Sequence, residues 1–243
     1  MPTMFEHTNK QFHADIEEAR SLFLEMGGQV EAMLRGGMQA LATGDVDIVD
    51  EVRMREKEVN RLEVEIDERI ILLIARNQPT AIDLRLLLSI SKMLTDMERC
   101  GDEAEKIAKM AGRLHDAERG YEAVVELRHM ADLVGNMIRN ALDSFARQDE
   151  VAATSVMHAD KEVNKEWKAS LRHIITFMIE DPRTISRSID LIFIARALER
   201  IGDHAKNMAE RVIFMVRGDD VRHVGAQRIE QLLQNDSQFP PNE

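Results

Sequence analysis

The pentapeptide ERCGD (residues 98–102) returns later in the chain as ERIGD (residues 199–203), and this repetition decides the fold. A second block, KEVN, occurs at residues 57–60 and again at residues 161–164, and an acidic residue precedes each copy. Because two different blocks recur in the same order, the chain is an internal repeat of two units of similar length.

Each unit carries three long stretches in which apolar residues recur every three or four positions, the period of an amphipathic helix. Of the five prolines, only Pro79 and Pro182 lie in the interior, so few positions interrupt these helices. Short connections make successive helices antiparallel. The sequence therefore predicts an all-α fold, a tandem repeat of two antiparallel three-helix bundles. The six long helices are expected at residues 9–43, 45–77, 80–116, 119–148, 150–180 and 183–217.

The same pattern divides the chain into domains. Residues 9–116 form the first unit and residues 119–217 form the second. Residues 218–243 are expected to be a partly disordered C-terminal extension, with one more short helix at residues 229–233.

Charge excludes several classes of partner. The 243 residues carry a formal net charge of −12, with 31% charged and 4% aromatic residues. Nucleic acids and anionic membrane surfaces are bound through basic faces, so the acidic excess argues against both. It leaves two interpretations open, a solvated acidic surface and a site for cations.

Cysteine content and hydropathy concern the location of the protein. The single cysteine, Cys100, excludes an internal disulfide and a cysteine-based zinc site. The longest uninterrupted apolar run, residues 70–75, is far shorter than a membrane span. The N-terminal residues lack the apolar core of a signal peptide, so we expect a cytoplasmic protein.

Paired carboxylates are the strongest chemical signal. Glu98 and Asp102 stand four residues apart in the first unit, as Glu199 and Asp203 do in the second, and such residues share one face of a helix. Two carboxylates so placed repel each other unless a cation lies between them. A glycine inside each pair indicates that a neighbouring helix or an ion approaches closely.

The preceding helix of each unit carries its own polar pair at the same spacing, and antiparallel packing would bring the two pairs together. Such a patch offers only oxygen ligands, which suit Mg²⁺, Mn²⁺ or iron and not zinc. The alternative is an acidic face that is solvated or neutralised by salt bridges. The predicted metal ligands are Glu56, Asn60, Glu98, Asp102, Asp160, Asn164, Glu199 and Asp203.

Other residues near these blocks have simpler interpretations. Arg99 and Arg200 follow the glutamates and point elsewhere on the helix, so they are expected to form salt bridges. His204 is expected to be a surface histidine, and Cys100 a small core residue because it aligns with Ile201. The chain has no phosphate-binding loop and no nucleophile or dinucleotide motif, so no enzyme class is indicated.

The duplicated block is also where the sequence becomes recognisable. ALERIGDHAKNMAE (residues 197–210), QPTAIDLRL (residues 78–86) and GDDVRHVG (residues 218–225) resemble the signature of the PhoU family. The resemblance implies two three-helix bundles, often dimeric, with multinuclear metal clusters on the acidic faces of some members. Several members carry Asp where this chain has Asn60 and Asn164.

The resemblance implies a regulatory role. Members link the PstB-type ATPase of a phosphate importer to a PhoR-type sensor kinase, and they repress the phosphate-starvation response when phosphate is plentiful. We therefore expect a non-enzymatic adaptor and a homodimer that reaches the membrane only through its partners. Two alternatives remain at this point: a metal-dependent hydrolase or oxidase that uses the acidic clusters, and a metal-free helical scaffold.

Overall fold

The computed structural model describes residues 4–115, 124–222, 224 and 229. Over these residues the chain forms six α-helices and a single 3-10 turn, and the all-α prediction is confirmed. The elements are α1 (Met4–Thr43), α2 (Val46–Asn77), α3 (Ala81–His115), α4 (Val124–Arg147), α5 (Glu150–Glu180), η1 (Pro182–Thr184) and α6 (Ile185–Arg217).

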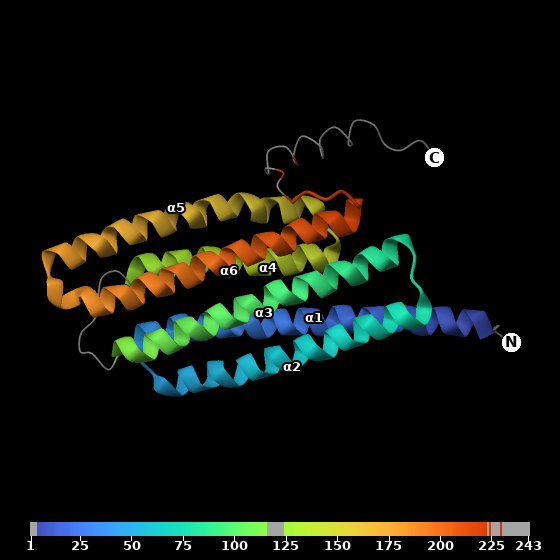
Figure 1. The fold of residues 1–243 in the computed structure, drawn as a ribbon, viewed down its shortest axis with the longest axis horizontal. Helices are drawn as coiled ribbons and strands as arrows, with labels where there is room; N and C mark the ends of the chain where they lie inside the picture. The colour runs from blue at the N-terminus through green and yellow to red at the C-terminus, as the bar shows by residue number, and fades with distance from the viewer. Residues whose placement is uncertain (1–3, 116–123, 223, 225–228, 230–243) are drawn as a thin grey trace.

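The helices form two bundles that lie against each other. Helices α1, α2 and α3 contact one another, as do α4, α5 and α6. The bundles meet where α3 packs on α6 and where α1 packs on α4. Figure 1 shows α5, α6, α3 and α2 side by side in one layer, with α4 and α1 behind it. The α2–α3 and α5–α6 connections lie at opposite ends of this layer.

Local sequence explains where the helices end. Asp45 and Asp149, which correspond in the two units, cap α2 and α5: each carboxylate accepts a backbone N–H of the first turn, 2.9–3.0 Å away. Gly44 has φ 72° after α1, a left-handed conformation that glycine adopts without strain. The two interior prolines lie in the breaks after α2 and α5, as predicted.

The core runs through both bundles and across their junction. The rings of Phe23 on α1 and Phe145 on α4 meet edge to face, with centroids 5.1 Å apart. Cys100 on α3 is completely buried, and its Sγ lies 3.8 Å from the backbone oxygen of Ile201 on α6. The ERCGD and ERIGD blocks therefore pack against each other at the junction.

Several sequence expectations differ from the structure or lie beyond it. The first helix begins at Met4 and not at residue 9, because no glycine or proline in residues 4–8 ends it. The expected start of the fourth helix at residues 119–123 lies outside the described residues. So do residue 116, residues 230–233 of the expected short helix, and the tail beyond them.

Candidate functional site

The first predicted patch lies where α2 and α3 run side by side. Glu56 and Asn60 on α2 and Glu98 and Asp102 on α3 are all partly buried. The Asn60 side-chain amide donates a hydrogen bond to Oε1 of Glu56 at 2.5 Å. Burial raises the pKa of Glu98, and the neighbouring carboxylates of Asp102, Glu63 and Glu56 raise it further. The structure thus brings the four predicted residues into one acidic environment.

Glu63 is a member of this cluster that the sequence analysis missed. It stands seven residues after Glu56, so the helical period alone places both on one face of α2. The repeat hides it, because Trp167 occupies the corresponding position of the second unit. We call Glu56, Glu63, Glu98 and Asp102, with Asn60, the first acidic cluster.

The second patch lies in the corresponding place between α5 and α6. Asp160 and Glu199 are buried, with 7% and 6% of their surface exposed. Burial raises the pKa of Glu199 and of Asp203, and each is raised further by Asp160. The Asn164 side-chain amide donates to the backbone oxygen of Asp160 at 3.0 Å. We call Asp160, Asn164, Glu199 and Asp203 the second acidic cluster.

Two cations distinguish the second cluster from the first. Nη1 of Arg196 lies 2.5 Å from Oε1 of Glu199, and Nζ of Lys206 lies 3.4 Å from Oδ2 of Asp160. The corresponding residues of the first unit are Thr95 and Glu105. In the first cluster Arg99 lies 3.4 Å from Glu98 and 3.3 Å from Asp102. The first cluster therefore keeps more uncompensated negative charge than the second.

Whether these residues suit a metal can be judged from their oxygen atoms. Oε2 of Glu199 is buried and has no hydrogen-bond partner among the described residues, and burial of an unpaired carboxylate oxygen is costly. Carboxylate and amide oxygens suit hard cations. In the described part of the chain, however, no three Asp, Glu, His or Cys side chains are already arranged to hold a metal. The donor set fits an oxygen-ligated cation once side chains move, and metal binding stays a prediction.

The residues around the blocks have defined partners. Arg200 reaches from α6 to Glu103 on α3 with an Nη1–Oε1 distance of 3.1 Å, so both Arg99 and Arg200 form salt bridges as predicted. The expectation for His204 was wrong. Its side chain is partly buried at the junction, with Nδ1 2.8 Å from Oδ1 of Asp96, because α3 covers this face of α6.

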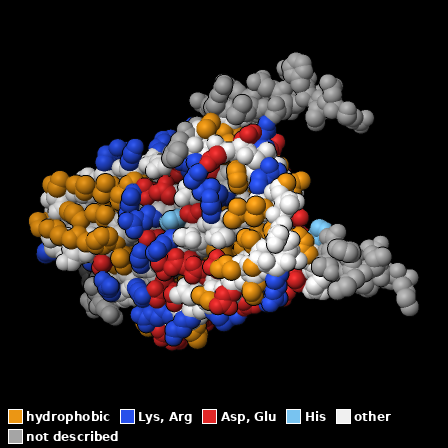
Figure 2. All heavy atoms as spheres, turned by 45° about the vertical axis from the view of Figure 1, so that its right-hand side comes forward, with side chains coloured by type: hydrophobic (Ala, Val, Ile, Leu, Met, Phe, Trp, Pro, Cys, Tyr) orange, Lys and Arg blue, Asp and Glu red, His pale blue; other side chains and the backbone are white. Residues whose placement is uncertain are grey.

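Figure 2 shows acidic side chains gathered over the middle of the molecule, among Lys and Arg side chains. It also shows hydrophobic side chains gathered at the end formed by the α5–α6 connection. The Arg200–Glu103 contact joins residues next to Glu199 and Asp102, so the two clusters lie on either side of the α3–α6 junction. The site is thus an acidic surface shared by both bundles.

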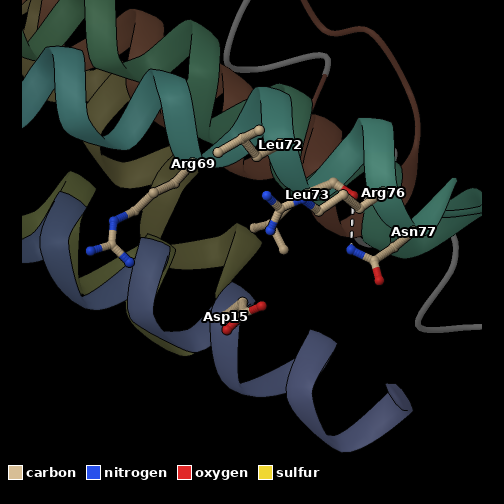
Figure 3. A pocket seen from close by; sticks show the side chains of 6 residues that line it. All are labelled: Asp15, Arg69, Leu72, Leu73, Arg76 and Asn77. Atoms are coloured by element: carbon tan, nitrogen blue, oxygen red, sulfur yellow. Dashed lines mark hydrogen bonds between the residues drawn. The ribbon is translucent and has the colours of Figure 1, made fainter.

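A separate cleft of about 320 Å³ lies between α1 and α2 near the end of α2. Figure 3 shows Arg69 extending toward α1, where its guanidinium lies 2.8 Å from Glu18, and Asp15 facing the cleft from α1. The Asn77 side-chain amide donates to the backbone oxygen of Leu73 at 3.0 Å. These contacts make the cleft a charge-balanced joint between two helices, and none of the predicted ligands lines it.

Comparison with known proteins gives the family. The PhoU domain profile matches residues 23–111 and 127–212, which is one match in each bundle. The chain belongs to the PhoU family. A phosphate-specific transport system accessory protein PhoU homolog of Pseudomonas putida is 47% identical over 227 residues, covering 93% of this chain and 89% of that protein.

Solved PhoU structures agree with this fold. The crystal structure of PhoU from Pseudomonas aeruginosa superimposes with a TM-score of 0.83 at 46% identity, covering 86% of this chain and all of that one. The phosphate transport system regulatory protein PhoU from Streptococcus pneumoniae gives 0.79 at 26% identity, covering 86% and 99%. No helix in the described residues is long and apolar enough to cross a membrane.

Proposed function

We propose that this protein is a non-enzymatic regulator of phosphate uptake and of the phosphate-starvation response. The observation that carries the proposal is the 47% identity, over 93% of the chain, to a phosphate-specific transport accessory protein. Two helical bundles with a shared charged surface suit an adaptor, because they offer rigid faces to partners. In this role the protein represses starvation signalling when phosphate is plentiful.

Deletion of the gene tests this role. Cells that lack the protein are expected to express phosphatase in phosphate-rich medium, and the intact gene on a plasmid should restore repression. Unchanged phosphatase expression after deletion would contradict the regulatory function.

The partners we propose are a PstB-type transporter ATPase and a PhoR-type sensor kinase. The protein would act in the cytoplasm as a homodimer and reach the membrane only through these partners. Size-exclusion chromatography with light scattering measures the oligomeric state. Pull-down of each purified partner by the full chain, with and without the other, tests the link between them.

We also propose that the acidic clusters bind Mg²⁺, Mn²⁺ or iron. The unpartnered, buried Oε2 of Glu199 and the raised pKa values of Glu98 and Asp203 support this, because a cation would compensate charges that water reaches poorly. Elemental analysis of protein purified without a histidine tag tests it. Protein without bound metal, whose melting temperature chelators leave unchanged, would instead support a metal-free scaffold.

A further inference from the structure

An apolar face lies along the end of the α5–α6 pair. Ile179 is 77% exposed and Phe193 is 52% exposed, values far above those of core residues. Figure 2 shows this end of the molecule covered by hydrophobic side chains. Large contiguous apolar patches are rare on monomeric proteins and mark binding surfaces. The α5–α6 face consists of Leu171, Ile175, Ile179, Ile185, Ile189 and Phe193.

These residues form two matched rows. The guanidinium of Arg196 lies 5.9 Å from the ring centre of Trp167, which sets the register between the two antiparallel helices. Moving from this contact toward η1, one turn at a time, brings first Leu171 and Phe193, then Ile175 and Ile189, and last Ile179 and Ile185 opposite each other. At 1.5 Å per residue each row is about 12 Å long, the length that roughly three turns of a further helix would cover.

The first unit shows that the fold does not require these side chains. Its corresponding α2 positions are Asp67, Ile71 and Ala75, and its α3 positions include Lys92. Oδ1 of Asp67 accepts a hydrogen bond from the Ser91 hydroxyl at 3.3 Å. Polar residues thus occupy part of this face in the first bundle, and the all-apolar rows of the second bundle are not a requirement of helix packing.

Charge around the face indicates what covers it. One edge of α5 carries a row of exposed basic side chains at helical spacing, Lys161, Lys165, Lys168 and Arg172, on a chain whose net charge is −12. The same row on a second copy would face it with like charge in a symmetric dimer, and a non-symmetric contact would not close. A partner with acidic side chains beside its apolar face is complementary.

The shape of the face favours a helix over a lipid surface. The apolar rows run along the side of the α5–α6 pair, while the turn at its end carries Glu180, Asp181 and Arg183. Entry of this end into a bilayer would bury those charges. A helix laid lengthwise between α5 and α6 would cover both rows and leave the turn in water.

We propose that the α5–α6 face is a docking site for an amphipathic helix of a partner protein, with an apolar stripe bordered by acidic residues. This inference rests on the adaptor function proposed above and assigns that function a surface.

Binding of designed peptides to the full chain tests the proposal. The probe is an 18-residue fluorescent amphipathic helix with leucines on one face and glutamates along both edges, and a matched peptide carries lysines at the edges. Anisotropy titration should show binding of the glutamate peptide and weaker binding of the lysine peptide. The Ile175→Glu/Ile189→Glu variant should bind the glutamate peptide about tenfold more weakly or worse.

The first unit offers a matched control. Ile71→Glu/Leu88→Glu places the same charges at the corresponding exposed positions and should leave peptide binding unchanged. Both variants should keep the helical circular dichroism and melting temperature of the parent, because all four positions are exposed. Equal peptide binding by the parent and both variants, or no binding at all, would overturn the docking site.

Other occupants give different results. Self-association abolished by Ile175→Glu/Ile189→Glu would assign the face to a second copy, and binding to vesicles of one-third phosphatidylglycerol lost in this variant would assign it to lipid. Either result overturns the proposal. Phosphatase assays separate the two hypotheses: if deletion derepresses phosphatase but Ile175→Glu/Ile189→Glu does not, the docking site is wrong and the regulatory function stands.

Discussion

The guanidinium of Arg200 crosses the junction between the two bundles, with its Nη1 3.1 Å from Oε1 of Glu103. Glu103 is 6% exposed, and its other cation is Lys106, 2.7 Å away. The contact therefore ties α6 to α3 beside both acidic clusters. It couples the positions of the two clusters, because any slide of one bundle on the other would leave a buried carboxylate with less compensation.

Arg200→Gln should lower the free energy of unfolding by about 1 kcal/mol, because it removes one of two cations from a buried carboxylate. Arg99→Gln is the matched control, since Arg99 is 57% exposed and pairs within its own helix. Its effect should stay within about 0.5 kcal/mol. Urea denaturation measures both changes, and equal effects would contradict a stabilising role for the junction contact.

Gly202→Ala should destabilise the protein although alanine favours helix. A Cβ at Gly202 would lie 3.3 Å from Cγ1 of the buried Val163, and overpacking a core costs about 1–3 kcal/mol. The net loss expected is about 1 kcal/mol, after a gain in helix propensity of similar size. Gly28→Ala, where a Cβ meets nothing within 4 Å, should instead stabilise by roughly 0.5–1 kcal/mol. Thermal denaturation distinguishes the two, and stabilisation by both would show that Val163 yields.

Glu98→Gln should stabilise the metal-free protein at pH 7 by about 1 kcal/mol or less, because the charged form is desolvated and repelled by its neighbours. The folded-state pKa of Glu98 lies above its ordinary value of 4.5, so its ionisation opposes folding as pH rises through the folded-state pKa. The advantage of the variant should shrink as pH falls through that window and vanish below 4.5.

Unfolding curves from pH 7 to pH 4 measure this dependence. Glu105→Gln serves as the control, because the Glu105 carboxylate has a lysine partner 2.6 Å away, Lys109. The control should not gain stability at pH 7. A gain for Glu98→Gln that is independent of pH would show that shape and not charge is responsible.

Mn²⁺ should bind the first acidic cluster more tightly than the second, since Arg196 and Lys206 already compensate the second. In calorimetric titrations, Glu98→Gln should weaken the tighter site by about tenfold or more. Arg196→Gln should strengthen the weaker site and leave the tighter one unchanged. Tighter binding lost through Asp203→Asn and not through Glu98→Gln would reverse the assignment.

Cys100 should resist thiol reagents in the native state. Its thiol is fully buried against Ile201, and burial raises its pKa well above the ordinary range, so the reactive thiolate is not formed. Modification should proceed more than about a thousandfold slower than for an accessible thiol, and its rate should follow unfolding as urea is added. Rapid modification without urea would show that α3 and α6 separate without unfolding.

The sequence by itself determined the architecture and the membership of the clusters. Helical period, two proline breaks and two repeated blocks specify six helices in two units, because these signals are local and the repeat doubles them. Spacing of four residues likewise placed Glu98 with Asp102 and Glu199 with Asp203. The glycine inside each pair was explained only by the structure: Val59 and Val163 approach there, and no ion is needed to account for it.

Only the tertiary structure decided how charge is distributed between the clusters. Arg196 and Lys206 neutralise one cluster, Glu63 adds to the other, and Asp96 meets His204 at the junction. Such contacts depend on which side chains face each other across neighbouring helices, and that depends on helix register and rotation. A repeated sequence predicts equal sites, whereas packing α3 against α6 brings different side chains to each and makes the two sites unequal.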